Sequence, residues 1–367
     1  MSISIVRRRE LSAVEWDALV LGSPDGWVFS LWGWQVLIEA VEPWALEDHS
    51  FAVREGRRLL AVVPLQYHPG SGRMASTGWG GSGPVIDGRL DGKARNKLMG
   101  QAIQHCIDLA RERGAAGFDA SFSPVTITSI SSAWGVNPLV FHGLEDRSGL
   151  AQVIDLSKSE DELWADLTSD ARRQIKQARE AGLVVERVDW AQHLDHYYEL
   201  HVATYRRTDV QPHPRTYFAG ISAHTAPSGH SVLWAVLTSS GEVLAYHNAA
   251  WFGCGAYYHT GCSAEDEGFP GASYLLFWEA MLGAKRAGMG WYDCGAIFPG
   301  AGASEKQRGL STFKTKFGGQ THRQFSTSLD FSCQDAVPAA VSPAPTFPNR
   351  LVRSLLFRLR AFNRNVR

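Results

Sequence analysis

Two side chains in the last quarter of the sequence are suited to acid–base and anion-binding chemistry. Asp293 ends an apolar, strand-like run just before Gly295, and Lys314 lies between Phe313 and Phe317. An ionised carboxylate at Asp293 can orient or deprotonate an attacking ammonium, although an aspartate that caps a turn has the same sequence context. The ammonium of Lys314 can pair with a phosphate or carboxylate at the edge of a cleft, or the side chain can extend along the surface.

Tyr258 and His259 lie in a predicted strand that precedes a glycine-rich loop. Imidazole titrates near neutral pH, so His259 can take up a proton close to a substrate. A strand histidine among aromatic residues is more often packed and hydrogen-bonded. Tyr258 is a candidate catalytic residue, and His259 and Phe313 are candidate substrate-binding residues.

The loop from Gly268 to Ser273 leads into an apolar helical run. Free N–H groups and the positive end of the helix dipole at such a start attract anions. Gly268, Gly271, Ala272 and Ser273 are therefore candidate cofactor-binding residues. The loop matches neither the P-loop nor the GxGxxG pattern, and a plain turn explains the glycines equally well.

Basic residues suggest a second anion-binding surface. Arg172, Lys176 and Arg179 follow one another at i, i+4 and i+7, which places them on one stripe of a helix. Such a stripe suits a polyanion, but a solvated charged face is commoner. Arg206 can bind a carboxylate or phosphate, or lie on the surface. The net charge of −1 gives no overall attraction to nucleic acid.

Other catalytic classes lack their motifs. The five cysteines form no CxxC pair, which argues against a disulfide framework and a zinc site. The GxSxG motif of serine hydrolases is absent as well. The zinc-binding HExxH motif is also absent, and we expect no bound metal. The N-terminus lacks an apolar signal segment, and we expect a cytoplasmic protein.

One supersecondary pattern occurs in each half of the chain. A glycine-rich loop leads into an apolar helix, a glycine stop and a strand containing aspartate. The copies begin near Gly80 and Gly268 and reach Asp119 and Asp293. A period of about half the chain indicates a duplicated domain rather than a solenoid.

Predicted hairpins support the duplication, because the one over 51–66 has a counterpart over 231–251. A long helical segment is predicted over 157–180. We therefore expect an α/β protein with a first domain over 1–150 and a second over 151–335.

The C-terminal region differs from the rest of the chain. A proline-rich linker is predicted over 336–348, followed by a basic amphipathic helix over 349–367 with six arginines and no acidic residue. Residues Arg353–Arg367 can lie on an anionic membrane at its inner face, grip a partner or tRNA, or dock on the protein itself.

Several segments together resemble the FemABX-like peptidyltransferases and their BioF2-like relatives, a group of the GNAT superfamily built from two GNAT domains. The Phe313-Lys314-x-x-Phe317-Gly318 ending is the most specific of these. The others are the helix Leu163–Arg179 with Gly182, the Tyr197–Leu200 and Thr204–Arg207 segments, and Trp291–Gly295.

The resemblance implies two tandem GNAT-like domains with mixed β-sheets flanked by helices, followed here by the basic helix. It implies amide formation: an aminoacyl group moves from aminoacyl-tRNA to an amine acceptor, such as a peptidoglycan precursor or a small peptide or amine. Lys314 would bind the acceptor or the donor, and no cofactor would be tightly bound. The helical arm of some tRNA-using members is absent.

Two alternatives stay open. An acyl-CoA-dependent N-acyltransferase of envelope polysaccharide or natural-product biosynthesis would hold the CoA pyrophosphate on 268–273. A non-catalytic binding protein would retain the fold and attach through Arg353–Arg367. In the enzyme readings we place the donor in the second domain and the acceptor between the domains, with catalysis mainly by positioning.

Overall fold

The computed structural model describes residues 3–77, 81–132, 135–207, 209–264 and 269–331. The chain divides into two compact units, Met1–Gly149 with Gln324–Arg367 and Leu150–Arg323, here called unit 1 and unit 2. The predicted linker over 336–348 and basic helix over 349–367 lie outside the described residues. Within the described ranges, no helix combines the length and apolar character needed to cross a membrane.

Unit 1 contains a set of short strands and four α-helices within its described residues. In chain order the elements are β1 (Ile3–Arg7), α1 (Ala13–Leu21), α2 (Trp32–Glu39), β2 (Glu47–Asp48), β3 (Phe51–Glu55), β4 (Arg58–Val63), β5 (Gln66–His68), β6 (Arg73–Ser76), β7 (Val85–Ile86), α3 (Gly92–Glu112), β8 (Gly117–Ser121), α4 (Ile127–Ser131), β9 (Glu145–Asp146) and β17 (Ser326–Asp330). Short 3-10 helices span Arg8–Glu10, Val28–Ser30, Glu42–Trp44 and Pro138–His142.

The strands of unit 1 form two sheets, in the orders β1-β3-β4-β7 and β2-β5-β6-β8-β17-β9. The predicted second domain over 151–335 includes β17, but this strand pairs antiparallel with β8 of unit 1. Arg73 stabilises the pairing, because it donates to Asp119 at 2.7 and 2.9 Å and to Asp330 at 2.6 Å.

Unit 2 has longer strands. Its elements are β10 (Gly149–Asp155), α5 (Glu160–Asp166), α6 (Ser169–Glu180), β11 (Val184–Val188), α7 (Trp190–Arg207), α8 (Arg215–His224), β12 (Ser231–Leu237), β13 (Val243–Phe252), β14 (Gly255–Ser263), α9 (Ala272–Arg286), β15 (Trp291–Ile297), α10 (Glu305–Thr315) and β16 (Gln320–Gln324). They form one seven-stranded sheet, in the order β11-β12-β13-β14-β15-β10-β16, within the described residues.

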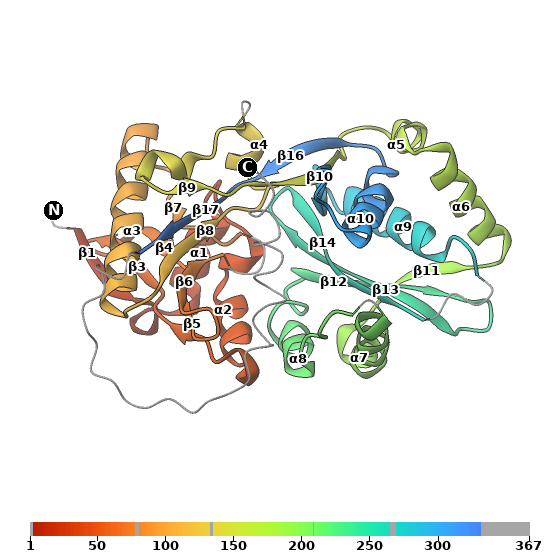
Figure 1. The fold of residues 1–367 in the computed structure, drawn as a ribbon, viewed down its shortest axis with the longest axis horizontal. Coiled ribbons are helices and arrows are strands. Elements are labelled where there is room, and N and C mark those ends of the chain that lie inside the picture. The colour runs from red at the N-terminus through yellow and green to blue at the C-terminus, as the bar shows by residue number, and fades with distance from the viewer. Residues whose placement is uncertain (1–2, 78–80, 133–134, 208, 265–268, 332–367) are drawn as a thin grey trace. The chain divides into compact units, whose positions relative to one another are not determined.

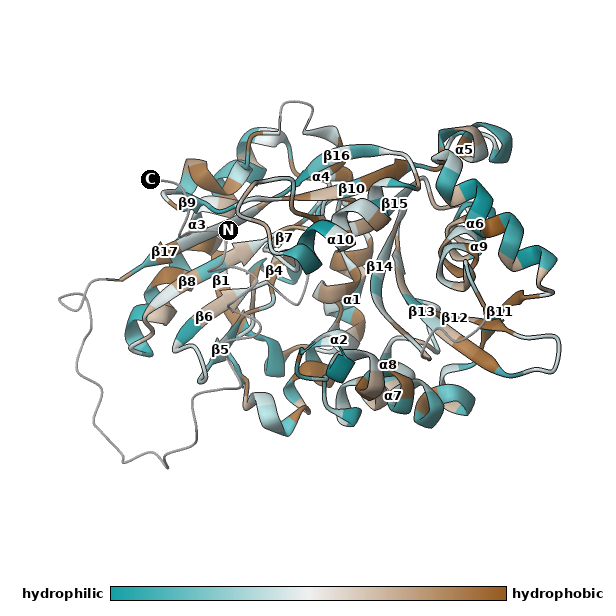
Figure 2. Ribbon diagram, turned by 45° about the vertical axis from the view of Figure 1, so that its right-hand side comes forward, coloured by the Kyte–Doolittle hydropathy of each residue, from teal (hydrophilic) through white to brown (hydrophobic). Residues whose placement is uncertain are grey.

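Helices cover both faces of the unit 2 sheet. Figure 1 shows α7 and α8 on one face and α6, α9 and α10 on the other. The core beneath α9 is built from large apolar side chains, including Leu276, Phe277 and Met281. Figure 2 shows α6 as mostly hydrophilic, since only Ala171, Ile175 and Ala178 of this helix are buried.

The strands β14 and β15 pair over a short distance only. Within the described residues their parallel register covers Gly255↔Trp291, Ala256↔Tyr292 and Tyr257↔Asp293, although β14 continues to Ser263. The strands therefore separate just beyond Asp293. Asp293 therefore lies at the point where the two strands diverge.

The segment predicted as one helix over 157–180 is two helices. The chain is extended at Leu167 (φ −61°, ψ 144°), and the Thr168 hydroxyl then caps α6 by accepting from the Ala171 N–H at 3.2 Å. Threonine is a favoured N-cap residue, so the new start is encoded locally. The break lets α6 run alongside α9.

Gly271 is required at the crossing of α6 and α9. Its backbone is left-handed (φ +84°), and a Cβ atom there would lie 2.1 Å from the Gln174 carbonyl oxygen. Gly182 has a similar backbone (φ +77°), but nothing lies within 4 Å of an added Cβ. A substitution at Gly182 therefore introduces backbone strain alone, whereas the same substitution at Gly271 adds steric overlap to that strain.

We expect Gly271→Ala to be more destabilising than Gly182→Ala. An alanine in the left-handed region costs ~1–2 kcal/mol at either position, and the overlap with Gln174 should add roughly 1–3 kcal/mol. Urea unfolding of the two variants measures the difference directly. Equal free energies of unfolding would show that the α6–α9 contact is not tight at Gly271.

Candidate active site

Asp293 is a buried carboxyl group at the point where β14 and β15 separate. The side chain is only 2% exposed, and its Oδ1 accepts a 2.7 Å hydrogen bond from the Gly295 N–H. Burial raises the pKa of Asp293 to about 7, while the Gly295 N–H and the charge of Lys314 lower it. A carboxyl group with this pKa can exchange protons at neutral pH.

Lys314 lies beside Asp293 because α10 directs it there. The helix starts with a capping box between Ser304 and Gln307, and the Lys314 Nζ donates to the Ala296 carbonyl at 2.8 Å. A Cβ added to Gly295 would lie 3.0 Å from this Nζ. Gly295, which has φ +88°, therefore leaves room for the ammonium. The predicted pair of Lys314 and Asp293 is brought together.

The aromatic residues around Lys314 anchor α10. The Phe313 ring lies 5.0 Å from Tyr274 and 5.7 Å from Phe277 of α9, and the Phe317 ring lies 4.3 Å from Phe277. Phe317 is fully buried and Phe313 is half-buried. Phe313 was a candidate substrate-binding residue, and its contacts are those of a packing residue.

Tyr257, which is not among the site residues predicted from the sequence, shares a face with Asp293. These two residues are register partners, and partners in adjacent strands project to the same side of a sheet. A Cβ on Gly295 would lie 3.7 Å from the Tyr257 ring. Tyr258 projects to the opposite face, where its ring lies 5.4 Å from Phe277 and 4.5 Å from His247.

His259 is held in a hydrogen-bonded network on the Tyr257 side. Its Nε2 lies 2.8 Å from the Tyr217 hydroxyl of α8, and the amide nitrogen of Asn248 donates to its Nδ1 at 3.3 Å. Burial lowers the pKa of His259 to about 3, so the imidazole is neutral at pH 7. The Tyr257 ring stacks 5.8 Å away. This geometry places His259 as a neutral neighbour of the site.

The start of α9 is partly covered. Gly268 lies outside the described residues, whereas Gly271, Ala272 and Ser273 form the first turn. Among the described residues no side chain caps the helix, and the Gln174 carbonyl oxygen lies against Gly271. This carbonyl lies on the Cα side of Gly271, where it makes Gly271 a packing position between α6 and α9.

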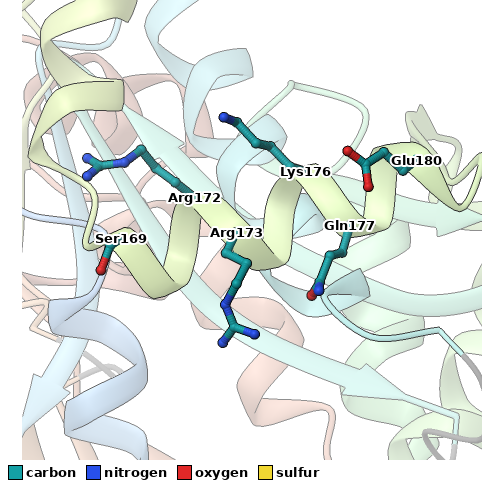
Figure 3. Close-up of a pocket in the computed structure, with 6 residues that line it drawn as sticks. All are labelled: Ser169, Arg172, Arg173, Lys176, Gln177 and Glu180. Atoms are coloured by element: carbon teal, nitrogen blue, oxygen red, sulfur yellow. The ribbon is translucent and has the colours of Figure 1, made fainter.

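The predicted stripe on α6 is partly used for internal contacts. Arg172 donates to the carbonyls of Ala165 at 2.9 Å and Leu167 at 2.6 Å, and so caps the end of α5. Arg179 pairs with Glu279 of α9 at 2.7 Å. Figure 3 shows Arg172 and Lys176 on one side of the helix and Arg173 on the other.

Basic side chains remain exposed on α6: Arg173 and Arg179, which pair with Asp170 and Glu279, and Lys176. Lys176 lines the depression drawn in Figure 3 together with Ser169, Arg172, Arg173, Gln177 and Glu180. Arg206 is also exposed, but it lies in the last turn of α7, on the opposite face of the unit 2 sheet. The surface offers positive charge to a polyanion, but less than the spacing of Arg172, Lys176 and Arg179 predicts, because two of these three side chains make internal contacts.

Comparison with known proteins identifies the fold of both units. Residues 165–309 match the family described as acetyltransferase (GNAT) domain. The crystal structure of FemX is similar to this chain with a TM-score of 0.68 and 16% identity, over 90% of this chain and 98% of that one. No curated protein matches the sequence.

Two further structures have the same architecture. A tandem GNAT protein from the clavulanic acid biosynthesis pathway, solved without AcCoA, has a TM-score of 0.53 and 13% identity, over 92% of this chain and all of that one. The C-terminal domain of a putative lysylphosphatidylglycerol synthetase from Agrobacterium fabrum has a TM-score of 0.55 and 13% identity, over 86% and 90%. The tandem GNAT-like fold expected from the sequence is confirmed.

Proposed function

We propose that this chain is an acyltransferase that forms an amide bond at Asp293 and Lys314, since residues 165–309 match a GNAT acetyltransferase domain and the fold is similar to that of FemX. The observation that carries the proposal is the buried carboxyl of Asp293, whose pKa is about 7, beside the Lys314 ammonium. The acceptor ammonium first gives up one proton to water, and the neutral amine attacks the carbonyl carbon of the donor. Asp293 then takes the second proton from the attacking nitrogen and passes it to the leaving oxygen or sulfur as the bond to that atom breaks.

Lys314 has an electrostatic role in this proposal. As the nitrogen attacks, negative charge develops on the donor carbonyl oxygen. A fixed ammonium in a largely water-excluded site stabilises such charge more strongly than water does. The hydrogen bond to Ala296 holds the ammonium in place without neutralising it.

The acceptor approaches from the face covered by α7 and α8. Asp293 and Tyr257 project to this face, and His259 and Tyr217 border it. These aromatic and imidazole groups are neutral at pH 7, because burial lowers the pKa of His259 to about 3 and raises that of Tyr217 well above its ordinary value. Asp293 is thus the group on this face suited to take the proton.

Aminoacyl-tRNA is the donor that we propose. The support for this donor is that Arg173 and Lys176 are exposed on α6, where they offer positive charge to a polyanion. The alternative donor is acyl-CoA, which the GNAT domain match favours. The acceptor is a peptidoglycan precursor or another peptide or small amine.

A donor screen with the purified chain tests this assignment. We expect charged tRNA to be retained on filters in a saturable manner, with affinity falling steeply as salt rises. Lys176→Gln should weaken retention and lower the salt dependence, whereas Lys158→Gln should do neither, because Lys158 lies just before α5 and pairs with Asp166. Thermal stabilisation by acetyl-CoA or a longer acyl-CoA, without tRNA retention, would replace aminoacyl-tRNA with acyl-CoA as the donor.

A further inference from the structure

Lys316 connects three helices through one ammonium group. Its Nζ donates to Asp170 Oδ2 of α6 at 2.7 Å and to the Tyr274 hydroxyl of α9 at 2.9 Å, while the residue itself caps the end of α10. The ammonium also lies 5.3 Å from the centroid of the Tyr274 ring. Its side chain is 24% exposed, so these bonds are partly shielded from water.

The position of α10 depends on a small number of directed contacts. No residue of α10 is fully buried among those the structure describes. The Ser311 hydroxyl, which accepts from the Phe298 N–H at 2.8 Å, and the half-buried Phe313 ring hold it before and beside Lys314. Beyond Lys314, the end of the helix is held by the buried Phe317 ring, by the Thr168 N–H donating to the Lys316 carbonyl at 3.0 Å, and by the Lys316 ammonium. The ammonium is the charged contact among these three, and its loss should loosen the turn that carries Lys314.

We infer that Lys316 is a positioning residue, which with Asp170 and Tyr274 holds the Lys314 ammonium against Ala296 and beside Asp293. The inference rests on the proposed function for its kinetic consequence only. The geometric consequence, a shift of the Lys314 charge relative to the Asp293 carboxyl, is measurable without any substrate.

The charge of Lys314 is sensed by Asp293. Lys314 lowers the pKa of this carboxyl, and burial and the Gly295 N–H are the other influences on it. The titratable groups near Asp293 are Lys314 from α10, Tyr257 from β14, and its strand neighbours Tyr292 and Cys294, whose pKa values burial raises. Moving Lys314 away should raise the pKa of Asp293, since a nearby cation favours the charged form.

The test is a titration of the carboxyl by ¹³C NMR in protein labelled at the aspartate carboxyls, with the resonance assigned through Asp293→Asn. We expect Lys316→Met to raise the pKa of Asp293 by roughly half the rise seen in Lys314→Met, ~0.5 against ~1. Lys316→Arg, which keeps a cation for Asp170, should stay near the native value. Lys158→Met breaks another 2.7 Å Lys–Asp pair of unit 2 and should change nothing.

Kinetics provide the second readout, using the donor that the screen identifies and hydroxylamine as a minimal amine acceptor. We expect Lys316→Met to lower kcat about 10-fold with KM nearly unchanged, and Tyr274→Phe to lower it less. If Lys316→Met is poorly folded by circular dichroism, Tyr274→Phe carries the test. An unchanged Asp293 titration in a folded variant would overturn the inference, whatever the activity. Full activity of Asp293→Asn would refute the proposed function instead.

Discussion

Replacing Asp293 with asparagine should lower kcat by about 10²–10⁴-fold near pH 7 and at the same time stabilise the folded protein. The loss of activity follows because the amide cannot take a proton from the acceptor. The gain in stability follows because a buried carboxylate without full compensation is costly. Activity and stability thus change in opposite directions at one position.

The sign of the stability change depends on pH. The ordinary pKa of an aspartate is 3.8, and that of Asp293 in the folded protein is about 7. As the pH rises between these values, the unfolded chain loses its proton first, so the free energy of unfolding falls until the folded carboxyl also ionises. The span corresponds to at most ~4 kcal/mol. Asp293→Asn should therefore be most stabilising at pH 8 and nearly neutral at pH 4.

Asp119 provides the matched control. It occupies the equivalent register position in unit 1, opposite Ala75 of β6, but it is paired with Arg73. Asp119→Asn removes one of the two carboxylates that pair with Arg73 and should destabilise the protein by about 2 kcal/mol. Urea unfolding at pH 4 and pH 8 compares the two variants. A destabilised Asp293→Asn at pH 8 would show that the carboxylate is better compensated than the structure indicates.

Lys314→Met should lower kcat about 100-fold and move the acidic limb of the pH–rate profile to higher pH. The first effect follows from losing the cation beside the donor carbonyl. The second follows because Lys314 lowers the pKa of Asp293, so removing it leaves the carboxyl protonated over a wider range. Steady-state kinetics from pH 5 to 9 measure both effects.

Lys285 is the control for this substitution. Its Nζ also donates to a backbone carbonyl of unit 2, that of Leu156 at 2.9 Å, but it lies in the last turn of α9. Lys285→Met should leave the pH–rate profile unchanged. If Lys314→Met lowers kcat but leaves the acidic limb of the pH–rate profile unchanged, Lys314 does not influence the pKa of Asp293.

The duplication predicted from the sequence reflects a physical constraint that is local in each half. In both units a glycine stop ends a helix and the next strand enters the sheet in parallel, which places Asp119 and Asp293 at matching register positions. The sequence pattern contains the turn, the helix and the strand, so it was sufficient to predict them. What surrounds each aspartate comes from distant segments, Arg73 in one unit and Lys314 in the other.

Other features of the site required tertiary information. Alternation along β14 separates Tyr257 from Tyr258 but does not say which face meets Asp293. A bulge at His259 further changes the register, since Asn248 pairs with Thr260 and Ala249 with Tyr258. The helix α10 was missed, although the Ser304 and Gln307 capping box was a readable signal. The role of Gly271 depends on Gln174, which belongs to a helix nearly a hundred positions away.

The place of β17 has a consequence for how the chain is made. This strand fills the position between β8 and β9, yet it follows the whole of unit 2 in sequence. All of unit 2 must therefore be synthesised before β17 can complete the sheet of unit 1. Asp330, which pairs with Arg73, is made 257 residues after it. Until then β8 and β9 have unpaired edges of the kind that recruit other chains. Unit 1 therefore emerges first but is completed last. The time for which the edges of β8 and β9 stay unpaired is set by the length of unit 2.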